Sequence, residues 1–369
     1  MRRYAAVLMS MAMAASLAAC GGASQTVTGA AGTKATETKA AETQAAAGDT
    51  TAAAAADSSD PSQYKTDSGW PTGNNITMIV PAGAGGTLDL CARVVATELE
   101  KELGSTVVVE NVPGGGMWVG WKQTLASEPD GYTFCVYNVP AVAVANYNEA
   151  NPQKEGPSDF AKLCNHTVDY GALAVRADDS RFSDVDSFVE YAKENEVLCT
   201  AGSIGLSNAD SLGALWFNNS YGTKITVMTV DSSSDGMARF YAGDTDCFFG
   251  SIGDLLSEKD AGVYKVIATF GPERSDLMPD VPTLKELGYD YESYVGRGFA
   301  FPAGVDQKIV DNMTKALSKA CEAAEEKVRE LGCETHIVTG KEYDQMEQEL
   351  LERRLAIYGL TLDDKVVNK

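Results

Sequence analysis

Three glycines stand between a short apolar run and an amphipathic segment of helical spacing. Residues 76–93 read I-T-M-I-V-P-A-G-A-G-G-T-L-D-L-C-A-R. The glycines at 83, 85 and 86 let the backbone approach a ligand without interference from a Cβ atom. The first N–H groups of the helix point back at this loop, and Thr87 can cap the helix. The pattern predicts a site for a small carboxylate, with a purely structural glycine turn as the alternative.

Other glycine motifs narrow the chemistry. A dinucleotide-binding fingerprint needs a third glycine where Leu88 stands, and the second cluster, 114–116, has Val119 at the corresponding place. The nearest approach to a P-loop has Trp121 in place of the lysine. We therefore expect no nucleotide and no cofactor.

Histidine is scarce, with only His166 and His336 in the chain. Zinc sites and Ser-His-Asp triads need histidines that converge with other ligands or with a nucleophile, and these two are far apart in sequence. We expect no metal site and no catalytic residues. Catalysis by carboxylates alone stays open as a minority hypothesis, although no pair of acids stands out.

The amino terminus has the form of an export signal. Arg2 and Arg3 precede an apolar stretch, residues 4–15, that is too short to span a membrane. Its end, Leu-Ala-Ala-Cys-Gly at 17–21, resembles a bacterial lipobox, which implies cleavage after residue 19 and acylation of Cys20. We expect the protein to be exported and anchored by lipid to the outer face of the cell membrane.

A tether is predicted from residue 20 to residue 69. Of the 49 residues from 21 to 69, 34 are Ala, Thr, Gly or Ser, so the segment has too few large apolar side chains to bury a core. Helix formation in the alanine runs is the alternative, but scattered Gly, Thr and Asp residues disfavour it.

The formal net charge is −22. Such acidity promotes solubility and makes nucleic acid an improbable partner. Apart from Cys20 the chain has seven cysteines, an odd number that cannot all pair, and none forms a C-x-x-C motif. Between none and three disulfides remain open. The seven are Cys91, Cys135, Cys164, Cys199, Cys247, Cys321 and Cys333.

Strand and helix patterns alternate through the 300 residues after residue 69. Strands are expected at 76–80, 107–110, 133–137, 170–176, 197–201, 224–230, 245–249 and 263–270. Helices are expected at 87–103, 119–126, 185–194, 209–218, 236–242, 282–287, 305–331 and 340–358. This order predicts an α/β protein with parallel sheets covered on both faces and a ligand at the carboxyl ends of strands. The length suits two lobes.

Several motifs in fixed order resemble the substrate-binding proteins of tripartite tricarboxylate transporters, the Bug-type receptors. They cover nearly all of residues 74–360. The motifs are Ile79-Val80-Pro81, Gly85-Gly86, Asp89 and Arg93, Val107 to Asn111, Pro113-Gly114, Pro129 to Thr133, Thr200 to Ser203, Gly243 and Asp246, Arg274, Pro279 to Thr283, and Phe301 to Gly304.

The resemblance implies a two-lobe, type II periplasmic-binding-protein fold, with each lobe a mostly parallel sheet flanked by helices. Lobe 1 would comprise residues 70–173 and 298–369, and lobe 2 residues 174–297. A ligand carboxylate would be held in the cleft between Ala82–Thr87 and Ser203–Asn208. The family further implies a monomer that hands its ligand to membrane permease subunits.

Departures from the family pattern bear on specificity. Val112 stands where an arginine is common, Met117-Trp118 replace small or amide residues, and Asp231 adds an acid where a lysine segment is usual. We expect a monocarboxylate, a zwitterion or an amino-acid-like ligand rather than a tricarboxylate. The candidate ligand-binding residues are Ala84, Gly85, Gly86, Thr87, Asp89, Gly116, Trp118, Tyr137, Asn138, Ser203, Ser207, Asn208, Asp231 and Ser251.

Two of these candidates have a structural alternative. Trp118 could serve packing between elements. Asp89, in the first helical turn and four residues before Arg93, could pair with that arginine and complement the helix dipole. At the level of the whole protein, a ligand sensor of the same fold and, less favoured, a surface enzyme remain alternatives to the transport receptor.

Overall fold

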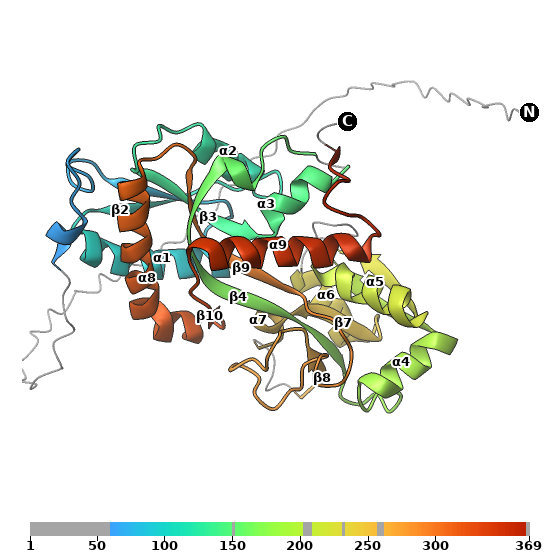
Figure 1. Ribbon diagram of the computed structural model, residues 1–369. Helices are drawn as coiled ribbons and strands as arrows, with labels where there is room; N and C mark the ends of the chain where they lie inside the picture. Colours follow the sequence, from blue (N-terminus) through green and yellow to red (C-terminus); the bar gives the residue numbers. More distant parts are fainter. Residues whose placement is uncertain (1–59, 150–151, 202–208, 231–232, 257–261, 367–369) are drawn as a thin grey trace, which may run out of the picture. The chain divides into compact units, whose positions relative to one another are not determined.

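The computed structural model describes residues 60–149, 152–201, 209–230, 233–256 and 262–366. In these ranges helices pack against a mixed β-sheet (Figure 1). The predicted α/β class is confirmed. Among the helices of these ranges, none combines the length and the apolar composition that a membrane crossing requires.

A parallel group of three strands carries the glycine loop. Strand β1 (Ile76–Val80) pairs in parallel with β2 (Val107–Asn111) and β3 (Thr133–Val139). Four of its five residues are buried, which explains why the strand reads as a continuous apolar run. Helices α1 (Thr87–Leu103) and α8 (Gln307–Glu330) bury their apolar faces in the same core.

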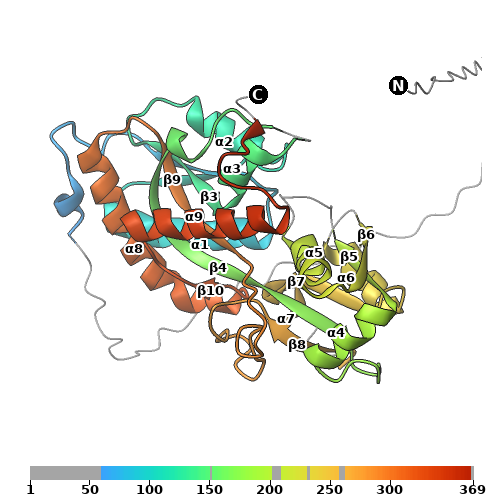
Figure 2. The same cartoon turned by 45° about the vertical axis from the view of Figure 1, so that its right-hand side comes forward.

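Strand β4 (Phe160–Arg176) changes partners along its length. From Phe160 to Tyr170 it pairs antiparallel with β9 (Tyr294–Pro302), which in turn pairs antiparallel with β3. From residue 171 onwards it pairs with β7 (Cys247–Ser251) and β8 (Tyr264–Thr269). Figure 2 shows β4 running through both groups of strands.

A second apolar core lies around the far half of β4. It includes Phe182, Phe188, Phe217 and Phe249, all fully buried. Around it lie β5 (Glu196–Ala201), β6 (Lys224–Thr229), α4 (Val185–Glu194) and α5 (Asp210–Tyr221). Helices α6 (Ser233–Ala242) and α7 (Ile252–Leu256) bury apolar side chains in a separate cluster. The remaining elements are α2 (Trp118–Leu125), α3 (Ala141–Val144), α9 (Gly340–Ile357), β10 (Glu334–Thr335) and the 3-10 turns η1 (Pro61–Tyr64), η2 (Ala145–Tyr147) and η3 (Pro157–Asp159).

The prediction of mostly parallel sheets needs correction. Among the described strands, parallel pairing is confined to β1 with its two neighbours and to β5 with β6, and every pair made by β4 or β9 is antiparallel. The lobe boundaries at residues 173 and 298 stay predictions.

Two segments were assigned wrongly from the sequence. Residues 282–287 form a bridge and turns instead of a helix, because the Thr269 N–H donates to the Pro282 carbonyl and the Leu284 N–H donates to the Thr269 carbonyl, on either side of a bridge to Thr283. The tether does not reach residue 69, since Tyr64 is buried in the core and its hydroxyl donates to Glu102 over 2.8 Å.

Candidate ligand-binding site

The glycine loop leads directly into α1, as predicted. Gly85 has a positive φ of 85°, a backbone conformation that favours glycine, and a Cβ at Gly86 would meet only one atom within 4 Å, the Gly83 oxygen at 3.9 Å. The space in front of the loop is therefore open. Gly86, not Thr87, is the N-cap residue, and no side chain caps the helix. The N-terminal N–H groups of α1 thus keep the capacity to bind an anion.

Asp89 holds this loop in place from within. Its carboxylate accepts hydrogen bonds from the Gly85 backbone N–H at 2.8 Å, from Asn111 Nδ2 at 2.9 Å and from Arg93 Nε at 3.1 Å. Burial would raise the pKa of Asp89, but these hydrogen bonds and the Arg93 charge outweigh burial and lower it. The side chain is 2% exposed, so the contacts favour the structural role over contact with a ligand.

The second loop places its candidates differently. Gly116 is exposed and has a positive φ, and nothing lies within 4 Å of its Cβ position. Trp118 is buried, with its ring edge-on to Trp121 at 5.2 Å between ring centroids. This geometry is that of a packing residue, and a role for Trp118 as a pocket wall stays a prediction.

The candidates of β3 are also buried. Tyr137 donates its hydroxyl proton to Glu347 at 2.8 Å and is not exposed. Asn138 donates from Nδ2 to the sulfur of Met117 at 3.3 Å, which fixes the second loop, while its Oδ1 has no hydrogen-bond partner among the described residues. Their contact with a ligand stays a prediction.

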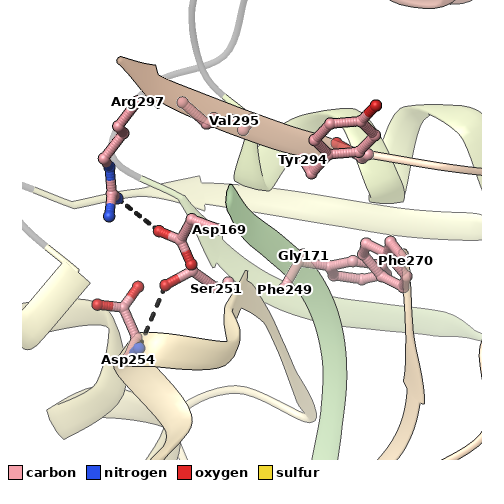
Figure 3. A pocket seen from close by; sticks show the side chains of 12 residues that line it. Asp169, Gly171, Phe249, Ser251, Asp254, Phe270, Tyr294, Val295 and Arg297 are labelled. Carbon is pink, nitrogen blue, oxygen red and sulfur yellow. Dashed lines mark hydrogen bonds and ion pairs between the residues drawn. The ribbon is translucent and has the colours of Figure 1, made fainter. Parts of the chain in front are cut away.

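A pocket of about 260 Å³ lies where β4 exchanges one set of partners for the other (Figure 3). Its polar and aromatic lining comes from β4, from β7 and α7, from the segment directly after β8, and from β9 with the residue before it. The lining residues are Asp169, Gly171, Ala209, Phe249, Gly250, Ser251, Asp254, Phe270, Ser293, Tyr294, Val295 and Arg297. Of the predicted candidates, Ser251 is the one in this set.

Gly171 makes the pocket's shape possible. A Cβ at this position would lie 2.5 Å from Cδ2 of Phe270, so any larger residue would displace that ring. The Phe270 ring therefore packs directly against β4 and forms an apolar side of the cavity, close to Phe249 at 6.2 Å between ring centroids. Figure 3 shows both rings beside the strand.

Three charged side chains line the pocket. Arg297 of β9 forms an ion pair with Asp169 of β4 at 2.5 Å. Burial raises the pKa of Asp254, and the negative charge of Asp169 raises it further, against the lowering effect of the Ser251 hydroxyl. The backbone N–H of Asp254 also donates to Ser251 Oγ at 3.2 Å. Two carboxyl groups and one guanidinium thus face the cavity.

Asp169, Asp254 and Arg297 are not among the site residues that the sequence predicts. Asp169 was placed just outside its strand, and β9 was not predicted at all, so nothing indicated that Arg297 would meet Asp169. Ser203, Ser207, Asn208, Asp231 and Cys20 lie outside the described residues. Ala209, which lines the pocket, directly follows the predicted loop 203–208 in the sequence.

No group of three or more His, Cys, Asp or Glu side chains in the described part of the chain could hold a metal ion. Of the two histidines, His336 is exposed and His166 is not. His166 is buried and stacks on Phe299 at 6.0 Å between ring centroids, and burial lowers its pKa to about 4, so it is neutral at physiological pH.

Comparison with known proteins gives the family. The profile described as tripartite tricarboxylate transporter family receptor matches residues 91–359, which include every residue that lines the pocket. The chain belongs to this receptor family. The match begins at Cys91, so the glycine loop lies just before the matched segment of this family receptor.

Three known proteins are similar to this chain in sequence or in fold. A Cupriavidus necator protein described as UPF0065 protein in gbd 5'region is 28% identical over 292 residues, 76% of this chain and 86% of the relative. A TctC solute binding protein from Polaromonas, solved without ligand, is 22% identical with a TM-score of 0.70, covering 79% of this chain and 99% of that chain. MatC from Rhodopseudomonas palustris, solved with bound malate, is 21% identical with a TM-score of 0.59, covering 78% of this chain and 99% of that chain. The predicted solute-binding-protein fold is confirmed.

Proposed function

We propose that this receptor is a lipid-anchored, extracytoplasmic protein that captures a small carboxylate and delivers it to the membrane subunits of a tripartite transporter. It is a binding protein and not an enzyme. The observation that carries the proposal is the uncapped and unobstructed N-terminus of α1, held open by the contacts of Asp89. A helix N-terminus of this kind binds a carboxylate through backbone N–H groups and the helix dipole.

The pocket supports a ligand that also carries a positive charge. Two carboxyl groups, Asp169 and Asp254, line the pocket together with one guanidinium, that of Arg297, so these three side chains carry a net negative charge when both carboxyls are ionised. A ligand ammonium group would offset that charge, whereas a further carboxylate would be repelled. The relative solved with bound malate supports a ligand of about the size of malate. The charges that line the pocket in this chain favour an amino acid over a hydroxy acid.

Aspartate and malate test this directly, because they differ by an ammonium group in place of a hydroxyl. Titration calorimetry with the full chain is expected to give tighter binding of aspartate by about tenfold or more, which corresponds to a charge-assisted hydrogen bond. Asp254→Asn should bring the two affinities close together. The matched control is Asp235→Asn, at an exposed carboxylate on α6 that does not line the pocket.

Three results would count against parts of the proposal. Tighter binding of malate by the unchanged protein would reject an amine-bearing ligand. No binding of any small acid would reject the carboxylate receptor. Conversion of a bound acid into a new product, lost in Asp254→Asn, would indicate an enzyme.

A further inference from the structure

The described cysteines are buried thiols, and six of the seven lie in pairs that are far apart in sequence. Cys91 and Cys333 are in direct contact, with 3.4 Å between their sulfur atoms. Cys164 with Cys321 and Cys199 with Cys247 also share hydrogen bonds. Cys135 instead donates to the Ala300 carbonyl at 3.6 Å.

The pair of Cys91 and Cys333 lies next to Arg297, one of the residues that line the pocket. Cys91 is in the second turn of α1, the helix that begins at the glycine loop, and Cys333 immediately precedes β10. Arg297, whose guanidinium pairs with Asp169 at the pocket, also donates a hydrogen bond to Cys333. Cys91 and Arg297 further share the lining of a small cavity next to His166. The contact between the two thiols thus connects α1, which begins at the glycine loop, with Arg297, which lines the pocket.

The surroundings make the two thiols unequal. The hydrogen bond from Cys91 and the positive charge of Arg297 lower the pKa of Cys333, against burial and the charge of Asp169. Cys333 is therefore the thiol that more readily becomes a thiolate, which is the nucleophile in thiol–disulfide exchange. Cys91 is placed to attack second.

We propose that Cys91 and Cys333 form a disulfide bond in the exported protein. The sulfur atoms need to approach by about 1.4 Å, from 3.4 Å to the length of an S–S bond near 2.0 Å. Such bonds form and persist outside the cytoplasm, and the inference therefore rests on the extracytoplasmic location proposed above.

The oxidant is a disulfide, either of an oxidoreductase or of a small molecule. The Cys333 thiolate attacks one sulfur of that disulfide, and the other sulfur leaves as a thiolate. Cys91 then loses its proton and attacks the mixed disulfide at Cys333, which releases the second thiolate. Two protein thiols become one disulfide, and the oxidant's disulfide becomes two thiols, so electrons and protons balance.

The bond would close a covalent loop between two residues that lie 242 positions apart, one in α1 and one directly before β10. A constraint on so long a loop acts mainly on the unfolded chain. A disulfide would also prevent Cys333 from becoming a thiolate that pairs with Arg297. The Arg297 guanidinium could then interact only with Asp169 and with a ligand among these groups.

The test uses the full chain, purified under reducing conditions and then exposed to oxidised glutathione. Free thiols are alkylated with iodoacetamide after denaturation without reductant, and the digest is analysed by mass spectrometry. The expected product is a linked pair of peptides that contain Cys91 and Cys333. Alkylated Cys91 and Cys333 in the oxidised sample, or linkage of either one to a different cysteine, would overturn the proposal.

Thermal melting gives a second measurement. Reductant is expected to lower the melting temperature of the oxidised chain by about 4–8 °C. The matched control, Cys135→Ser, should keep this shift, because Cys135 contacts a carbonyl and not a thiol, whereas Cys91→Ser should abolish it. If Cys91→Ser does not fold, the peptide analysis of the unchanged protein decides alone.

Discussion

Replacement of Asp89 by alanine tests whether the glycine loop is held by that buried carboxylate. The change removes the acceptor for Gly85 N–H, Asn111 Nδ2 and Arg93 Nε. A hydrogen bond to a charged group contributes about 1.5–3 kcal/mol. The hydrogen bond from Arg93 contributes less than this, because the Arg93 side chain is 46% exposed. Gly85 is also exposed, so water can replace Asp89 as the acceptor for its N–H group. We expect a net loss of about 2–3 kcal/mol in the free energy of unfolding.

The matched control is Asp235→Ala. Asp235 forms the same i,i+4 pair with an arginine, Arg239, at 3.4 Å, but its side chain is 39% exposed. An exposed pair of this kind contributes about 0–1 kcal/mol. Denaturation in urea at pH 7 measures both variants, and calorimetry with the preferred acid measures binding, which should weaken only in Asp89→Ala.

The effect of Asp89 should also depend on pH. Its pKa is lower in the folded than in the unfolded protein, so its stabilising contribution is fully present above about pH 4. It is lost as the pH falls through the folded-state pKa. Equal destabilisation by Asp89→Ala and Asp235→Ala at pH 7, or a gap between them that does not shrink in acid, would refute the reasoning.

Three further variants give distinct outcomes. Gly86→Val should still fold, because φ is −77° and the Cβ position is open. It should bind the acid tenfold or more weakly, a loss of about 1.4 kcal/mol. Unchanged affinity in calorimetry would remove the loop from the site. Asp254→Asn should raise the melting temperature of the ligand-free protein at pH 7. The raised pKa of Asp254 means that the folded protein disfavours its ionised carboxyl, and asparagine carries no charge there. This gain should disappear as the pH falls below about 4, where the carboxyl is protonated in the unfolded chain as well. Cys20→Ala should move the exported protein from the detergent phase to the aqueous phase in a phase-separation assay; equal partitioning of both proteins would exclude the lipid anchor.

The sequence predicted best what depends on local pattern. Strand β1, the glycine loop and α1 have the expected bounds, because an apolar run, three glycines and the left-handed stop at Gly104 all act within a few residues of one another. The ion pair of Asp89 with Arg93 was also foreseen from helical spacing.

The pocket depends on contacts that spacing does not reveal. The first half of β4 carries Asn165, His166 and Thr167, three buried polar residues that hide the strand pattern. Its partner β9 lies more than 120 residues later, and the register of that pair brings Asp169 opposite Val295 and near Arg297. Antiparallel pairing over such a separation is a property of the tertiary structure.

Strand β4 has a mechanical consequence for ligand binding. Because one continuous backbone pairs with β9 as far as Tyr170 and with β7 from Gly171, any twist between the two groups of strands must be absorbed within a few peptide units. Asp169 and Ser251 lie on either side of this change of partners. A ligand that bridges Asp169 and Ser251 would resist this twist. Binding of the ligand should therefore be detectable as slower amide hydrogen exchange around Tyr170, even when the strands themselves remain intact.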